Sequence, residues 1–361
     1  MKNYLNLVLP VALAGALCTG CSQDSSLSPT SPSATAGTIS FAPHTVYART
    51  GDITTSNLNS FQVYAYTGTG ADQQLFMDNV TVSRTANNTW TYSPLKYWPA
   101  EAVDFYAYAP TGTWAGTQGP FNNTTAYENY PGDTDLVYAV SLGNKGNATG
   151  ENAQVVLNFR HALAKVALNL SSSDDNIEVK VSNVVMAGVY CHGVFGYPSA
   201  STTASASPDP NSVCTWSDLD TPLTYLFHMS QTNDDRITLT TTPDNLSAYG
   251  LGGDKYMLPQ PLPYGASGHK VYLGVMCAIY DKATGVQLWP NDNTPATNVV
   301  NGATYKDGIL EFPLSTSQFS SWEPGHYYIY NVIVNANPDM GTINFGMPTV
   351  DTYVTVETTY E

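Results

Sequence analysis

Short runs of alternating apolar and polar residues recur along the whole chain, and turn-forming residues separate them. In one run, Val103, Phe105 and Ala107 alternate with more polar neighbours before a proline ends it. Side chains two residues apart lie on one face of a β-strand, so this is the period of a half-buried strand. Comparable runs occupy residues 61–66, 155–159, 165–170, 177–186, 236–242, 271–280 and 327–335. Because no long segment has the period of an amphipathic helix, the chain is predicted to be all-β, built from antiparallel β-sandwiches.

The two ends of the chain contain nearly the same strand. Residues 37–46 read GTISFAPHTV and residues 341–350 read GTINFGMPTV. Both copies place an isoleucine and a phenylalanine on one face, Ile39 and Phe41 in the first. If a protease removed the first copy, the second could fill the vacated position in a neighbouring molecule and so form a polymer. A chance match in a chain rich in threonine, glycine and valine is the alternative.

The first residues have the pattern of an export signal. Lys2 precedes an apolar run, residues 5–17, that is too short to be a permanent membrane anchor. The run ends at CTGC, residues 18–21, which resembles the lipobox of bacterial lipoproteins, so that Cys21 would carry the lipid and become the mature N-terminus. A lipobox usually has an aliphatic residue where this chain has Cys18. An ordinary signal peptide cut nearby is the alternative, and export is predicted in both cases.

A polar segment and an arginine follow the export signal. Residues 22–38 are dominated by serine, threonine, proline, alanine and glycine, so they lack the apolar side chains of a core and are predicted to be a tether. Arg49 is the first basic residue after Lys2, and a polar, turn-prone stretch follows it. An arginine in an exposed connection suits a trypsin-like protease, which would cut between Arg49 and Thr50. A solvated loop arginine is the alternative.

Charge and cysteine content argue against several classes of protein. The chain has 361 residues, enough for two domains, and a net charge of −16. Nucleic acid demands a basic surface, so no nucleic-acid partner is expected. The cysteines show no zinc or redox spacing. Cys277 is predicted to be a buried apolar residue, and Cys191 and Cys214 either form a disulfide or stay free.

No motif predicts catalysis or a cofactor. The six histidines are scattered, and His161 is predicted to be a hydrogen-bonded packing residue. Calcium on a loop, at Asp133 and Asp135 or at Asp218 and Asp220, is a weaker alternative. Core packing is the simpler interpretation of the tryptophans that could stack on sugars, which are Trp90, Trp98, Trp114 and Trp289. We therefore do not expect the chain to be an enzyme, and we predict no catalytic, cofactor-binding or metal-binding residues in it.

Four phrases together resemble the fimbrillin family of Bacteroides-type bacteria, whose members are the subunits of type V pili. They are CTGC at 18–21, FRHALAKV at 159–166, YMLPQPL at 256–262 and FPLSTSQFSSWEPGHYYIYNVIVN at 312–335. FRHALAKV and the W-x-P-G-x-x-Y-x-Y block are the more specific ones. The likeness extends from about residue 37 to the end of the chain.

The resemblance implies two tandem antiparallel β-sandwich domains of transthyretin-like shape. The expected divisions are a lipoprotein signal peptide at 1–21, a tether with a removable first strand at 22–49, domains at 50–168 and 169–346, and a C-terminal donor tail at 347–361. The resemblance also implies cleavage after Arg49, before Thr50, and loss of the strand that contains Ile39 and Phe41.

In the family, a strand from the next subunit fills the emptied groove, and the C-terminal tail matches that donor. Its alternation agrees, because one face, suited to a groove, is predicted to carry Val350, Val354, Val356 and Tyr360. The implied partners are other fimbrial subunits, in a homopolymer and with tip and anchor pilins, and an arginine-specific protease. A lipid such as palmitate on Cys21 would hold the precursor in the outer membrane, and the mature protein would form a fimbrium at the cell surface.

Two alternatives to this interpretation stay open. A tip or anchor subunit is one, although a stalk subunit is favoured because a tail with strand alternation follows the last family-like block. The other is a surface-anchored, glycan-binding lipoprotein whose aromatic residues form a sugar platform. A glycan binder would bind sugar as an uncut monomer, whereas a pilin would polymerise after the cut at Arg49.

Overall fold

The structure is a computed structural model. It describes residues 37–45, 52–68, 72–114, 121, 126–146, 154–205, 207–231, 235–246, 253–265, 268–291, 296–297, 307–317, 319–335, 345–346, 350–351 and 354–360. All of them belong to one compact unit, Thr35–Glu361. Their regular secondary structure is almost entirely β-strand, which confirms the all-β prediction. Within these ranges, no helix has the length and apolar character needed to cross a membrane.

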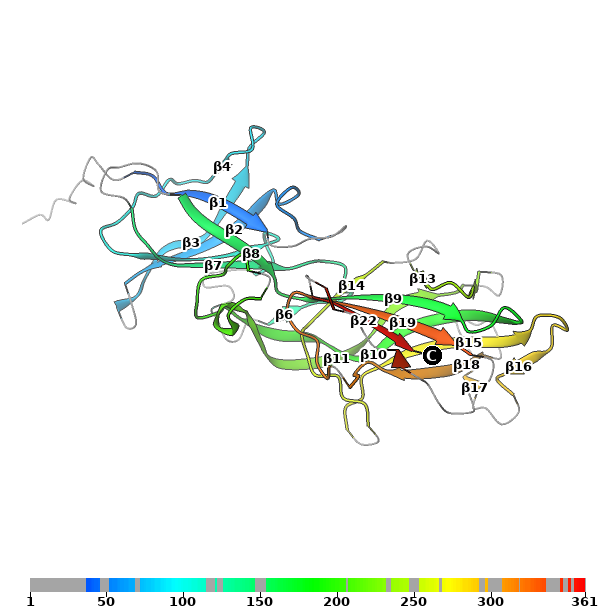
Figure 1. The fold of residues 1–361 in the computed structure, drawn as a ribbon. Coiled ribbons are helices and arrows are strands. Elements are labelled where there is room, and N and C mark those ends of the chain that lie inside the picture. Colours follow the sequence, from blue (N-terminus) through cyan, green and yellow to red (C-terminus); the bar gives the residue numbers. More distant parts are fainter. Residues whose placement is uncertain are drawn as a thin grey trace, which may run out of the picture. The chain divides into compact units, whose positions relative to one another are not determined.

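The first sheet contains strands from residues 40–161, in the order β1-β8-β7-β5-β2-β3-β4 (Figure 1). Its strands are β1 (Ser40–Thr45), β2 (Ser60–Thr67), β3 (Gln74–Arg84), β4 (Trp90–Thr91), β5 (Val103–Ala109), β7 (Val137–Asn144) and β8 (Gln154–His161). β1 lies at one edge and pairs with β8 in parallel. The other neighbours in this sheet are antiparallel.

One face of the first sheet surrounds an apolar core. Phe61, Phe105 and Phe159 enter it from β2, β5 and β8, where apolar residues alternate with more polar ones as the sequence predicted. The segment after β4 adds Tyr92 and Trp98 to the same core. The strands of this sheet and the segment after β4 therefore bury their apolar side chains in one shared core.

A second sheet has the order β11-β10-β15-β18-β17, with β6 and β12 paired to β10 and β16 paired to β15. Its strands are β6 (Tyr127–Glu128), β10 (Ile177–Gly196), β11 (Thr215–Met229), β12 (Ile237–Thr238), β15 (Tyr272–Asp281), β16 (Gln287–Trp289), β17 (Ala296–Thr297) and β18 (Asp307–Pro313). A short 3₁₀ turn at Pro210–Ser212 precedes β11. All pairings in this sheet are antiparallel.

A third sheet has the order β13-β9-β19-β22-β20, with β14 paired to β9 and β21 paired to β22. Its strands are β9 (Ala164–Ser172), β13 (Asp244–Asn245), β14 (Lys255–Met257), β19 (His326–Val334), β20 (Phe345–Gly346), β21 (Val350–Asp351) and β22 (Val354–Tyr360). β19 pairs in parallel with both β9 and β22.

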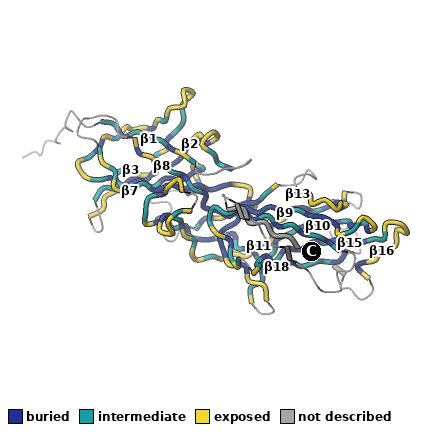
Figure 2. Tube along the Cα trace, in the orientation of Figure 1, coloured by how far each residue is buried: buried dark blue, intermediate teal, exposed yellow. Residues whose placement is uncertain are grey.

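The second and third sheets share one apolar core, which is the arrangement of a β-sandwich. Leu168 and Tyr330 reach it from the third sheet, and Val181 and Val275 from the second. Figure 2 shows buried residues following the strands of both sheets, with exposed residues mainly in the connections. Most strand pairs are antiparallel, as predicted, but the first and third sheets also contain parallel pairs. Their parallel partners are far apart in the sequence, so no hairpin imposes antiparallel pairing.

The chain passes from the first sheet to the third inside the segment FRHALAKV. β8 ends at His161 and β9 begins at Ala164. This change of sheet precedes the predicted boundary between residues 168 and 169. The domain limits and the transthyretin-like shape stay predictions.

The three cysteines of the described region are buried free thiols. Cys277 is fully buried in β15, which confirms the prediction for that residue. Cys191 donates to the carbonyl of Thr221, and Cys214 lies near the carbonyl of Ala162. The disulfide between Cys191 and Cys214 that the sequence left open is therefore not formed.

Candidate functional site

The first strand inserts its predicted inner face into the core of the first sheet. Ile39 and Phe41 are 2% and 3% exposed. The ring of Phe41 packs edge-on against Phe61, Tyr92 and Phe105, with centroid distances of 6.0, 5.5 and 5.7 Å. Edge-on aromatic pairs add to the stability that burial provides. The strand predicted to be removable is thus an integral part of this core.

Backbone contacts hold the first strand on both sides. β8 pairs with it along Ser40–Thr45. On the other side, the Ile39 amide donates to the Lys96 carbonyl at 3.0 Å, and the Trp98 amide donates to the Gly37 carbonyl at 3.2 Å. The Tyr92 hydroxyl donates to the Ile39 carbonyl at 2.9 Å. β1 therefore fills a groove between β8 and the segment that follows β4.

Pro43 is a buried proline within this strand. The amide of Ile39 points away from β8, toward Lys96. Amide direction alternates along an extended strand, so the nitrogen of Pro43, four residues later, lies on that same side. Proline has no N–H, and in sheets it occurs mainly where no ladder hydrogen bond is needed.

The predicted donor strand is paired within its own chain. β22 runs parallel to β19, with Val354 opposite His326, Val356 opposite Tyr328 and Tyr360 opposite Val332. Val350 lies in β21, opposite Val356. The second copy of the repeated strand contributes Phe345 to β20, opposite Tyr360. The C-terminal segment is therefore able to form a strand in a parallel pair.

Three predicted site residues lie outside the described residues. They are Cys21, Arg49 and Thr50. The described chain on either side of the predicted cut ends at Thr45 and resumes at Asp52. Thr45 and Thr55 are joined by a hydrogen bond from the Thr45 amide to the Thr55 hydroxyl, at 2.9 Å. Lipidation and cleavage stay predictions.

A buried polar cluster, which no sequence pattern predicted, follows the predicted cut. Lys165 Nζ lies 2.8 Å from Asp52 Oδ1 and 3.3 Å from Asp254 Oδ2. The Tyr256 hydroxyl donates to Asp52 Oδ1 at 2.8 Å. Burial, aided by nearby carboxylates, raises the pKa of Tyr256, so its hydroxyl keeps the proton that it donates. A lysine among the apolar residues that begin β9 was the available signal, because a buried lysine requires a partner.

His161 lies close to this cluster. Its Nδ1 is 2.9 Å from Asp135 Oδ2, and the same carboxylate oxygen accepts from the Ile53 amide at 2.9 Å. The prediction that His161 is a hydrogen-bonded packing residue is confirmed. Asp133 instead forms an ion pair with Lys255, at 2.7 Å. The two aspartates considered for calcium, Asp133 and Asp135, therefore bind different groups of the protein. No group of three or more potential metal ligands occurs among the described residues.

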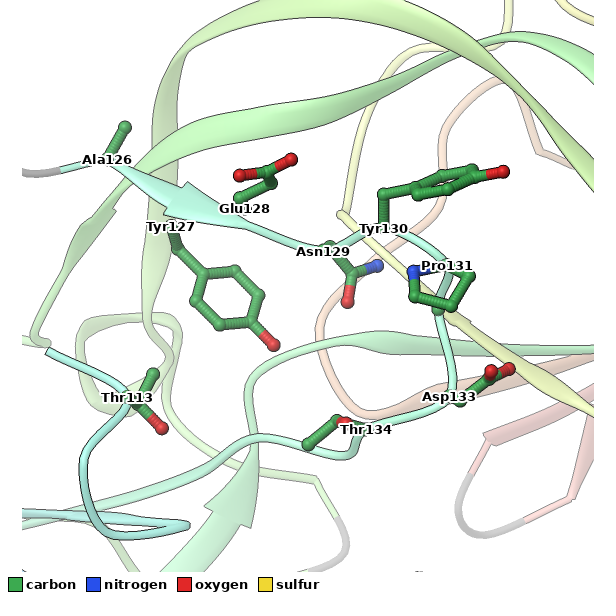
Figure 3. A pocket seen from close by; sticks show the side chains of 10 residues that line it. Thr113, Ala126, Tyr127, Glu128, Asn129, Tyr130, Pro131, Asp133 and Thr134 are labelled. Atoms are coloured by element: carbon green, nitrogen blue, oxygen red, sulfur yellow. The ribbon is translucent and has the colours of Figure 1, made fainter.

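A pocket of about 380 Å³ lies along β6 and the turn after it (Figure 3). Its lining residues include Tyr127, Glu128, Asn129 and Tyr130. Tyr130 is half exposed, and its ring lies 5.6 Å from that of Tyr225. One exposed ring beside polar groups is a small surface for stacking on a sugar.

The tryptophans do not form a sugar platform. Trp98, Trp114 and Trp289 are buried in apolar clusters, and Trp90 is partly buried against the core of the first sheet. Core packing, the simpler interpretation of these residues, is confirmed.

Two solved structures of fimbrial proteins are similar to this chain to different degrees. A fimbrial protein from Bacteroides vulgatus ATCC 8482 is similar in structure, with 17% identity and a TM-score of 0.52 over 90% of this chain and 98% of that one. A fimbrilin from Porphyromonas gingivalis W83 aligns with 9% identity and a TM-score of 0.44 over 90% of this chain and 97% of that one. The first likeness shows a shared fold and nothing further.

The family comparison concerns the sequence itself. No curated protein matches the chain significantly. The model of the fimbrillin-like family matches residues 48–261, which is more than half of the chain. This segment includes FRHALAKV and all of YMLPQPL except its last residue, Leu262. The chain therefore belongs to the fimbrillin-like family.

Proposed function

We propose that this chain is a stalk subunit of a fimbria that assembles by donor-strand exchange. The precursor is exported and lipidated on Cys21, an arginine-specific protease cuts between Arg49 and Thr50, and β1 then leaves its groove. The C-terminal segment of the next subunit, with Val350, Val354, Val356 and Tyr360, takes its place. Adhesion is the biological result, and no enzymatic activity is proposed.

The insertion of β1 is the observation that carries this proposal. A strand just ahead of Arg49 buries Ile39 and Phe41 in a core made by residues beyond Arg49. Full burial of such side chains contributes about 1.5–3 kcal/mol each. Removing β1 therefore exposes apolar surface and an unpaired edge of β8, and both favour the binding of another strand.

Cleavage explains why exchange would wait for the protease. While the chain is intact, the connection to β2 keeps β1 at a high effective concentration beside its groove. After the cut, β1 is a separate segment that gains translational freedom when it dissociates. A strand from a neighbouring subunit then competes on more equal terms.

The test is to treat the purified precursor with an arginine-specific protease. We expect one prominent cut at Arg49–Thr50, identified by intact mass, followed by a ladder of oligomers on a denaturing gel. A matched control, Arg49→Lys, keeps the charge but should abolish both the cut and the ladder. Deletion of residues 347–361 should leave the cut intact and remove the ladder.

Two results would overturn the proposal. One is a ladder formed by the chain that lacks residues 347–361, because the donor would then lie elsewhere. The other is a cut precursor that stays monomeric while the uncut monomer binds sugars on a glycan array. That second result, lost in a Tyr130→Ala variant, would favour a glycan-binding lipoprotein that uses the pocket along β6.

A further inference from the structure

The chain directly after the predicted cut enters a buried ionic contact. Asp52 is the third residue after Arg49, and it is 1% exposed. Its carboxylate accepts from Lys165 Nζ and from the Tyr256 hydroxyl, each at 2.8 Å. Lys165 is 3% exposed and belongs to β9 of the third sheet. Charge-assisted hydrogen bonds away from water are among the stronger polar contacts in proteins.

A second contact holds the next residue. The Ile53 amide donates to Asp135, which also contacts His161 at the end of β8. Asp135 and His161 are both 4% exposed. Both contacts therefore depend on FRHALAKV, because that segment supplies His161 to one and Lys165 to the other.

Different groups hold β1. Its contacts are the aromatic core around Phe41, the pairing with β8, and the backbone bonds to the segment Lys96–Trp98. None of these contacts involves the side chains of Asp52 or Lys165. Apart from the hydrogen bond between Thr45 of β1 and Thr55, the two ends of the connection that contains Arg49 are thus held by separate sets of residues.

We propose that Asp52, Lys165, Asp135 and His161 form an anchor that holds the retained end of the chain when β1 leaves. For its role in assembly, this anchor rests on the proposed cleavage and strand exchange. The four residues act as positioning residues. The hydrogen bonds and ion pairs described above link them to one another, to Ile53 and to the third sheet, and so they limit which part of the chain can come away.

The need for an anchor follows from the residues that come next. Leu58 is 3% exposed and packs in the same core as Phe61 of β2. If the new end of the chain loosened together with β1, opening would spread through Leu58 toward β2. The groove would then lose a wall as well as its strand. Anchoring at residues 52 and 53 confines the opening to the place of β1.

The contribution of the Asp52 charge can be tested without changing the volume of the side chain. Asp52→Asn keeps the volume of the side chain but removes its charge, and Lys165 retains Asp254 as a carboxylate partner. Asp254 is itself held by the Tyr327 hydroxyl at 2.8 Å. The cluster therefore stays occupied by polar groups, while the attachment of the N-terminal end is weakened.

The experiment measures hydrogen–deuterium exchange in the uncut full chain, so it depends neither on the protease nor on polymer formation. Phe41→Ser loosens β1, and Asp52→Asn is then added. In Phe41→Ser alone, we expect exchange to rise about tenfold or more in residues 37–45 and to stay near the wild-type rate in residues 52–60. In the double variant, both segments should exchange at least tenfold faster.

The buried pair Arg236–Asp307, with side chains 5% and 2% exposed, provides the matched control. Phe41→Ser combined with Asp307→Asn should leave residues 52–60 protected, because it removes a buried carboxylate elsewhere. If Phe41→Ser does not fold, Ile39→Ala loosens β1 more mildly.

Two results would overturn the anchor. The first is fast exchange of residues 52–60 as soon as β1 is loosened, with Asp52 intact. The second is protection of those residues in the Asp52→Asn double variant. A failure to polymerise in the protease experiment, with exchange as expected here, would count against the proposed function and leave the anchor in place.

Discussion

Phe41 makes three aromatic contacts from a strand of only six residues, so a large part of the strand's attachment depends on this side chain. Replacing a buried phenylalanine by alanine costs about 3–5 kcal/mol, because apolar contact is lost and a cavity remains. We expect Phe41→Ala to lower the free energy of unfolding of the uncut chain by this amount, measured by urea denaturation. Val156→Ala, at a half-exposed position of β8, should change it by less than about 0.5 kcal/mol.

The buried thiols lead to a prediction about pH. Burial raises the pKa of Cys214 and of Cys277 from 9.0 to about 12. Their stabilising contribution is complete below pH 9 and is lost as the pH rises from 9 toward 12, because unfolding then allows the thiols to ionise. We expect the urea midpoint to fall between pH 8 and pH 10, and to fall less in Cys277→Ala. Iodoacetamide should label neither thiol in the folded chain at pH 8.

Single residues differ in how well the sequence predicts them. Phe41 was predictable because its burial follows from local alternation. Asp52 was not, because its partners, Lys165 and Tyr256, are more than a hundred residues away. A local pattern contains no information on such a contact, and Asp52 looks like an ordinary turn residue.

At the scale of the element, the Tyr92 hydroxyl joins the segment after β4 to the residue that precedes β1. Tyr92→Phe removes the hydrogen bond to the Ile39 carbonyl while keeping the aromatic ring against Phe41. A neutral hydrogen bond contributes about 0.5–1.5 kcal/mol. We expect exchange of residues 37–45 to accelerate by about two- to tenfold, with the rest of the first sheet unchanged. Unaltered exchange would show that this hydrogen bond contributes little to the attachment of β1.

Strand existence was predictable, but strand partners were not. The repeated strand and the C-terminal alternation both indicated strands, and the structure places β1 and β22 there. The parallel pairs β1–β8 and β9–β19 join parts of the chain that are more than a hundred residues apart, so no turn between them predicts the pairing. Period-two alternation determines which face is buried, and it leaves direction and partner undetermined.

At the scale of the whole molecule, the proposed exchange requires one groove and one donor tail per subunit. A subunit that lacks residues 347–361 can accept a donor but cannot supply one, so it should end a growing fibre. Mixing it at increasing ratios with the full-length precursor before protease treatment should shorten the ladder progressively. The Arg49→Lys precursor, mixed in the same way, should leave fibre length unchanged, because its groove stays occupied.

The fold class and the family were predictable from the sequence. Strand alternation and the FRHALAKV and W-x-P-G-x-x-Y-x-Y segments can each be recognised within a short stretch of chain. The sequence did not predict that FRHALAKV is where the chain changes sheet, at Ala162 and Leu163. Nor did it predict the contact of His161 with Asp135 or of Lys165 with Asp52. Those facts depend on how three sheets come together, which alternation within a single strand does not encode.

Pro43 interrupts the row of backbone N–H groups on the side of β1 that faces away from β8. A stray strand that approached β1 on this side, beyond the contact with Lys96–Trp98, would meet the proline ring where it needs an N–H, which disfavours strand pairing there. Pro43 belongs to the same short segment that would depart in the proposed processing. One cut would therefore release both the strand that fills the groove and the proline that disfavours unwanted pairing. Because a peptide bond is broken, the change from monomer to polymerising subunit would be irreversible.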